Sequence, residues 1–155
     1  VPTPTRHQHQ PGPQRVQLGV LVREGGARAL LNFGHTIGHA MEAHSWEGQQ
    51  RGLLHGEAVA IGMLCEAWLS WRMDLLPRDA YDSIAALLTQ LYKPYRFDSA
   101  DNHRLIELMR NDKKNAKGQF RFALLTAIGK AKVDVPVTAA QVQEALEHYR
   151  LLVRG

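Results

Sequence analysis

The chain has 155 residues, of which 45% are hydrophobic and 22% are charged, and these proportions are ordinary for one globular domain. Its formal net charge is +4, but the basic residues are dispersed along the chain, so we expect no nucleic-acid partner. A single cysteine excludes an intramolecular disulfide, and no run approaches the roughly 18 apolar residues of a membrane span. We therefore expect a cytoplasmic protein without a membrane partner.

The first 15 residues combine four prolines with polar side chains and show no apolar periodicity. This composition predicts a disordered tail or linker. We therefore expect the folded domain to comprise residues 16–155. Its first stretch, residues 16–27, is short and interrupted by glycines, and it leads into the first long helix.

One helix is predicted from about Ala27 to His44. At about 100° per residue, it carries a polar stripe roughly 80° wide, and the rest of its circumference is apolar. The stripe consists of Arg28, Asn32, His35, His39 and Glu42. Such a helix is usually buried, so its stripe needs a metal ion, a charged substrate or water as partner, because burying unpaired polar groups costs a few kcal/mol each. Gly34 and Gly38, one turn apart, indicate the close approach of another backbone or a ligand.

A second predicted helix covers residues 56–73, which read GEAVAIGMLCEAWLSWRM. It is apolar on nearly all sides, so we expect it at the centre of the core. Cys65 lies within it and is predicted to be a reduced core residue. His55 stands at the entrance of this helix, where the first-turn amides and the helix dipole favour anions.

Three more helices and a hairpin complete the prediction. Apolar spacing predicts helices over residues 77–91 and 99–109. The last helix, residues 138–152, begins at a threonine that has the form of a capping box with the glutamine three residues on. Alternating apolar residues on both sides of Gly129 predict a small β-hairpin. The expected fold class is thus mainly α with one hairpin.

The histidines suggest metal chemistry without specifying it. Histidines at i and i+4 on a helix, such as His35 and His39, can bind one metal ion, and a catalytic zinc site normally needs a third ligand. His55 is the candidate for the further ligand. The protease pattern HExxH and the glycine-rich phosphate loops are absent. Spacing alone leaves open that the helical histidines are ordinary surface or core residues.

The combination of segments is more specific than the spacing. Residues 32–42 read NFGHTIGHAME, residues 54–63 read LHGEAVAIGM, residues 112–115 read DKKN, and residues 120–133 read FRFALLTAIGKAKV. Together with Arg28, four residues before the first segment, they resemble the signature of the 3-dehydroquinate synthase family, within the sugar phosphate cyclase group. The resemblance covers about residues 23–152.

The resemblance implies the helical C-terminal domain of the dehydroquinate synthase-like fold. Members use NAD and a divalent metal, usually zinc, with cobalt as another option, to cyclise a seven-carbon keto acid phosphate with loss of phosphate in the shikimate pathway. We expect the N-terminal NAD-binding domain to be absent from this chain, together with the NAD site and a glutamate metal ligand. The chain then has a phosphorylated small-molecule substrate but is inactive alone.

The resemblance also implies roles for individual residues. His35 and His55 would be metal ligands. His39 would contact the phosphate and carry its proton transfers. Arg28 would face the substrate carboxylate, and Asn32 would contact its hydroxyls or phosphate.

Three further residues complete the expected site. One or both of Lys113 and Lys114 would approach the phosphate. Glu24 is a catalytic candidate if the first helix starts early enough to place it one turn before Arg28. Two alternatives stay open, namely another sugar phosphate cyclase and a non-catalytic helical partner-binding module. Members of the group are commonly dimers, so a homodimer is an expected assembly.

Overall fold

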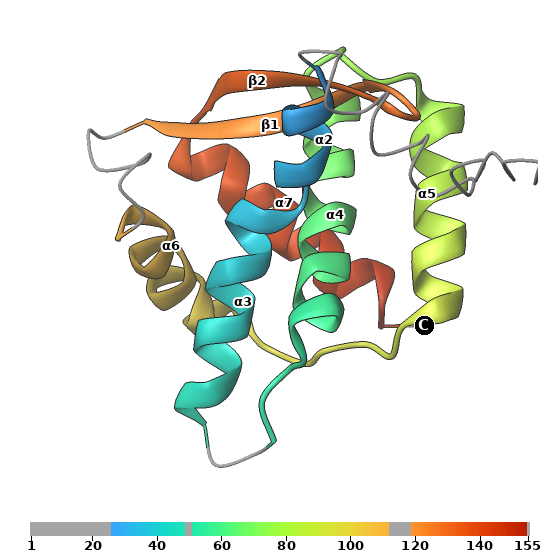
Figure 1. The fold of residues 1–155 in the computed structure, drawn as a ribbon. Coiled ribbons are helices and arrows are strands. Elements are labelled where there is room, and N and C mark those ends of the chain that lie inside the picture. Colours follow the sequence, from blue (N-terminus) through green and yellow to red (C-terminus); the bar gives the residue numbers. More distant parts are fainter. Residues whose placement is uncertain (1–25, 49–50, 112–118, 155) are drawn as a thin grey trace, which may run out of the picture.

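The structure, a computed structural model, describes residues 26–48, 51–111 and 119–154 (Figure 1). Its helices are α2 (Gly26–Asn32), α3 (His35–Glu47), α4 (His55–Arg72), α5 (Arg78–Leu91), α6 (Asn102–Arg110) and α7 (Ala139–Leu152), with a 3-10 turn η1 (Ser99–Asp101). The strands β1 (Phe120–Ala127) and β2 (Lys130–Val137) form one antiparallel hairpin. The predicted class, mainly α with one hairpin, is confirmed. The predictions for residues 1–15 lie outside the described residues.

Helix α4 is the centre of the fold. It packs against α3, α5, α7 and β1, and Figure 1 shows it between α3 and α5 with the hairpin across one end. Nearly every residue from Ala58 to Ser70 is buried, as its all-round apolar sequence predicts. Each buried leucine or isoleucine of this helix contributes roughly 1.5–3 kcal/mol by leaving water. The helix therefore holds the other elements in register.

The predicted single helix over residues 27–44 is wrong, because the chain forms two helices there. Helix α2 ends at Asn32, and α3 begins at His35 and continues to Glu47. Between them Gly34 adopts a left-handed conformation with φ +82°, which side-chain-bearing residues rarely adopt. A Cβ on Gly34 would also overlap Met63 of α4. The polar stripe is thus split between two helices.

Glycines let the backbones of α3 and α4 touch. A Cβ added to Gly62 would overlap the carbonyl oxygen of Gly34, and one added to Gly38 would lie 3.0 Å from Cα of Val59. The expected close approach of another backbone at Gly34 and Gly38 is therefore confirmed. This contact fixes the distance between the two helices that carry the histidines.

The remaining elements follow the sequence closely. Thr138 Oγ1 accepts a hydrogen bond from Gln141 N at 3.2 Å, and Gln141 Oε1 accepts one from Thr138 N at 2.9 Å, so the predicted capping box of α7 is present. The predicted helix over residues 99–109 begins with η1 and continues as α6. The hairpin turns at Gly129, whose φ is +84°.

Cys65 is buried in the core with 1% of its surface exposed, as predicted. Burial raises the pKa of its thiol well above the usual range, because the interior disfavours the thiolate. The thiol is therefore unreactive. Among the described helices, none combines the length and apolar character needed to cross a membrane.

Candidate metal centre

Three histidines converge where α3 and α4 begin. His35 is the first residue of α3, His39 lies one turn further along the same helix, and His55 is the first residue of α4. One ring nitrogen from each can be chosen so that all three lie within 4.8 Å of one another. The ring centroids are 5.4 to 5.9 Å apart. The fold thus brings His55, which follows His39 by 16 residues and His35 by 20, close to the face of α3 that these two histidines share.

Two of these rings are oriented by a hydrogen bond at Nδ1. His35 Nδ1 lies 3.2 Å from the carbonyl oxygen of Phe33, and His55 Nδ1 lies 2.9 Å from Oε2 of Glu42. A carbonyl or carboxylate oxygen can only accept, so Nδ1 is the donor in both rings. The lone pair of each is then on Nε2, available to a ligand. Metal-binding histidines usually show this arrangement.

Glu42 is a candidate functional residue that the sequence analysis placed on the polar stripe without a role. It lies on α3, three residues after His39, and reaches across to His55 on α4. The carboxylate therefore ties the two helices together at the candidate site. In the sequence, the spacing of three residues between His39 and Glu42 indicated that the two share a helix face. The contact between Glu42 and His55 could be seen only in the fold.

The start of α4 is fixed by a second acidic residue. Glu57 Oε1 accepts a hydrogen bond from Leu54 N at 2.9 Å and lies 3.7 Å from Nη2 of Arg51. An acidic group in the first turn also suits the positive end of the helix dipole. These interactions hold the backbone of His55 in place.

The start of α3 is held by a buried carboxyl of α4. Glu66 is 0% exposed, and its two oxygens accept hydrogen bonds from Gly34 N at 3.1 Å and from Ile37 N at 3.2 Å. Helix α3 has no side-chain cap of its own, so Glu66 satisfies its first-turn amides. Burial raises the pKa of Glu66 to about 8, although the two backbone hydrogen bonds act to lower it. Sequence analysis missed this residue.

The donor set fits a divalent metal such as zinc or cobalt. Imidazole nitrogen is a preferred ligand of both ions, and a site with three protein donors leaves a position for substrate or water. His39 and His55 are exposed and His35 is half-buried, so the cluster is open to solvent on one side. The arrangement can therefore hold an ion and still admit a substrate.

The structure does not test the roles of the other predicted site residues. Asn32 is the last residue of α2, beyond the break at Gly34, and its side chain is exposed. Arg28 lies in α2, but its side chain is outside the description. Glu24, Lys113 and Lys114 lie outside the described residues. Their predicted roles stay predictions.

Comparison with known proteins identifies the family. Residues 21–115, which include all three histidines, match the family described as 3-dehydroquinate synthase C-terminal. The 3-dehydroquinate synthase of Parabacteroides distasonis is 39% identical over 128 residues, covering 83% of this chain and 36% of that protein. That of Acidithiobacillus ferrooxidans is 43% identical over 126 residues, covering 81% and 34%. The chain thus spans about a third of the length of these relatives.

Solved structures show the same fold. A 2-deoxy-scyllo-inosose synthase complexed with carbaglucose-6-phosphate, NAD+ and Co2+ has a TM-score of 0.61 and 26% identity, covering 76% of this chain and 34% of that one. A 2-epi-5-epi-valiolone synthase from Streptomyces hygroscopicus, with NAD+ and Zn2+ bound, has a TM-score of 0.63 and 23% identity, covering 89% and 37%. The sequence match and the shared fold agree, and the chain belongs to the 3-dehydroquinate synthase C-terminal family.

Proposed function

We propose that this chain is the metal- and substrate-binding part of a 3-dehydroquinate synthase, a carbon-oxygen lyase that cyclises a seven-carbon keto acid phosphate with loss of phosphate. The observation that supports the proposal most directly is the convergence of His35, His39 and His55 within the family-matched segment. On this proposal the protein acts in the shikimate pathway towards aromatic amino acids, in the cytoplasm, and as a homodimer.

Within the cluster, His35 and His55 are the proposed metal ligands. Each ring is oriented by an acceptor at Nδ1, which fixes the direction of Nε2. A divalent metal bound there, with zinc proposed and cobalt as the alternative, would act as a Lewis acid that stabilises negative charge developing on a substrate oxygen. Glu42 keeps the His55 ring in the tautomer that leaves Nε2 free to bind.

His39 is proposed to exchange protons with the departing phosphate. It shares the exposed face of the cluster, and imidazole is the side chain that both gives and takes protons near neutral pH. Geometry alone also allows His39 to be a third metal ligand. Its assignment to proton transfer rests on the family resemblance.

The substrate contacts are proposed from the same resemblance. Arg28 would bind the substrate carboxylate, and Lys113 and Lys114 would bind the phosphate, since cations form their strongest hydrogen bonds with such anions. Asn32 would contact hydroxyl groups or the phosphate, and Glu24 remains a catalytic candidate. NAD binding is proposed for the portion of the relatives that this chain does not cover, so residues 16–155 alone are expected to be inactive.

A chimaeric enzyme tests the function. In the Acidithiobacillus ferrooxidans relative, the matched C-terminal part is replaced by the corresponding residues of this chain, and phosphate release from the seven-carbon substrate is measured with NAD and zinc. We expect release that requires both additions and is lost in His35→Ala and His55→Ala. The Lys130→Gln change at the tip of the hairpin is the matched control and should retain activity.

The other outcomes separate the alternatives. Release from a different sugar phosphate only would favour another cyclase, as the likeness to a 2-deoxy-scyllo-inosose synthase allows. A folded chimaera that binds zinc but turns over no sugar phosphate would contradict the catalytic proposal. Failure to bind zinc at all would favour a non-catalytic helical module. Turnover by the 155-residue chain alone would contradict the assignment of NAD binding to the uncovered portion.

A further inference from the structure

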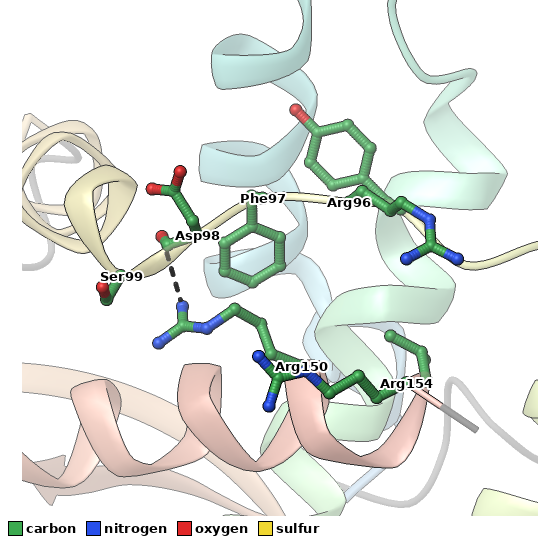
Figure 2. A pocket seen from close by; sticks show the side chains of 8 residues that line it. Arg96, Phe97, Asp98, Ser99, Arg150 and Arg154 are labelled. Atoms are coloured by element: carbon green, nitrogen blue, oxygen red, sulfur yellow. Dashed lines mark hydrogen bonds between the residues drawn. The ribbon is translucent and has the colours of Figure 1, made fainter.

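A cavity separate from the histidine cluster lies between the end of α7 and the segment before η1 (Figure 2). Its volume is about 380 Å³, and none of the three histidines lines it. Small-molecule sites usually measure roughly 300–1,000 Å³. The charged residues that line the cavity are Arg96, Asp98, Arg150 and Arg154. It is therefore large enough for a small anion and unusually rich in arginine.

Arg150 is held in a fixed orientation by neutral partners. Its Nη1 donates to Asn102 Oδ1 at 2.7 Å and to the carbonyl oxygen of Asp98 at 3.4 Å. The guanidinium carbon lies 5.1 Å from the centre of the Phe97 ring, which stacks on Tyr149. Asn102 is only 5% exposed, so this anchor is part of the packed interior. These contacts orient the guanidinium but leave its charge uncompensated.

The positive charge of the cavity exceeds the negative charge. Within the described part of the chain, no ion pair joins any of the three arginines to an acidic side chain within 4.0 Å. Among the described residues, Asp98 is the single acidic one that lines the cavity, and its carboxylate accepts a hydrogen bond from Ala100 N at 2.9 Å. Three arginines and one aspartate give a formal charge of +2. The C-terminal end of α7 offsets only about half a charge of this.

We propose that this cavity binds a phosphate group. A phosphate dianion matches the excess of two positive charges, whereas a carboxylate would neutralise half of it. Arg150 presents a pre-oriented planar fork of the kind that binds phosphate oxygens through two hydrogen bonds. Figure 2 shows Arg154 extending from the end of α7 towards Arg150, while Arg96 lines the cavity from the segment before η1 with its guanidinium pointing away from Phe97. The proposal is independent of the metal centre.

A purely structural account of the arginines is the competing explanation. Arg150 and Arg154 lie in or just after the last turn of α7, where cations stabilise a helix by interacting with its dipole. This account does not explain Arg96, which belongs to a different segment. It also predicts that phosphate and chloride act alike at equal ionic strength, because both would only screen the charges.

The test is a phosphate titration of the metal-free 155-residue chain, followed by nuclear magnetic resonance at constant ionic strength. The signals observed are the Nε–H of Arg150 and the amide of Ser99, so binding at the histidines is recorded separately. We expect saturable shifts at both signals with inorganic phosphate and none with chloride. Shifts that grow linearly, or that chloride reproduces, would overturn the proposal in favour of an adventitious ion only.

Variants make the test specific. Arg150→Gln should weaken phosphate binding by roughly tenfold or more, since a hydrogen bond to a charged group is lost. Arg154→Gln and Arg96→Gln change exposed side chains, so they keep the test decisive if Arg150→Gln does not fold. Lys130→Gln is the control, because it removes one exposed positive charge from a residue that does not line the cavity. This variant should bind phosphate like the parent. Equal weakening in all four would show a non-specific charge effect and overturn the proposal.

A second titration identifies the source of the phosphate group. Glycerol 3-phosphate is compared with inorganic phosphate on the same signals. Tighter binding of the ester would assign the cavity to a phosphorylated metabolite, and equal binding would assign it to free phosphate. Either result supports the phosphate site, whereas binding of acetate as tight as phosphate would contradict the match to a dianion.

Discussion

The carboxyl of Glu66 on α4 accepts a hydrogen bond at 3.1 Å from the backbone nitrogen of Gly34, the residue immediately before the candidate metal ligand His35. Its other oxygen accepts from Ile37 N at 3.2 Å. One buried acid therefore caps α3 directly after the break between α2 and α3. This cap fixes the position of His35, the first residue of α3. Because Glu66 and His55 lie on the same helix, the cap also ties the positions of the two proposed ligands to each other.

The buried position of Glu66 predicts a pH dependence of stability. Burial raises its pKa from an ordinary value near 4.5 to about 8, so between these values the unfolded chain has lost a proton that the folded chain keeps. The free energy of unfolding should therefore fall as pH rises through this window, by up to about 1.4 kcal/mol per pH unit, and change no further above it. Urea unfolding of the parent and Glu66→Gln at pH 5, 6.5 and 8 measures the effect. The difference between the two proteins should depend on pH, and parallel curves would contradict the assignment.

Much of the fold could be predicted because it depends on local pattern. The apolar circumference of α4, the capping box at Thr138 and the alternation around Gly129 each specify their element within a few residues. Long-range packing changes them little. The same is true of Cys65, whose neighbours in sequence already indicate a buried position.

The errors arise where a distant segment decides the local structure. Periodicity over residues 27–44 is compatible with one helix, and glycine permits either a helix or a left-handed turn. The break at Gly34 depends on the contact with Met63 and on the cap from Glu66, both on α4. For the candidate site, spacing placed two histidines on one face and indicated His55 as the candidate for a further ligand, but only the fold brings His55 close to the other two. The Glu42 contact needed the structure.

Gly62 should tolerate no larger residue. A Cβ there would overlap Gly34 O and lie 2.6 Å from Gly38 N, both backbone atoms. Gly62→Ala must therefore push α3 and α4 apart, and we expect a loss of about 1–3 kcal/mol or more in the free energy of unfolding. Gly56→Ala is the matched control, since its Cβ would meet nothing within 4 Å. Adding a Cβ within a helix there should leave stability unchanged or raise it by roughly 0.5–1 kcal/mol. Equal melting temperatures for both variants would contradict the close contact.

Ser70 joins the central helix to the hairpin. Its Oγ donates to the carbonyl oxygen of Glu66 at 2.7 Å and accepts from Leu125 N at 3.0 Å. Ser70→Ala leaves the buried amide of Leu125 without this acceptor, so unfolding free energy should fall by about 1–3 kcal/mol. Ser83→Ala removes an exposed hydroxyl that bonds only to its own helix, and its effect should stay within about 0.5 kcal/mol. Denaturant unfolding of the two variants compares them, and similar losses would contradict the proposed link.

Glu42 should control metal affinity without binding the metal. Its carboxylate accepts from His55 Nδ1 at 2.9 Å, which fixes the orientation of the ring and leaves Nε2 to bind the metal. Glu42→Gln keeps the size of the side chain but offers a weaker acceptor, so zinc affinity should fall by roughly 10–100-fold, as is usual when such an orienting group is changed. Glu47→Gln is the matched control on the same helix, since Glu47 pairs with Arg104 rather than with a histidine.

Zinc titration by calorimetry measures all variants, with weak binding expected in the parent and none in His35→Ala or His55→Ala. Equal zinc affinity in Glu42→Gln and Glu47→Gln would contradict the orienting role, and affinity that survives both histidine changes would contradict the metal centre itself.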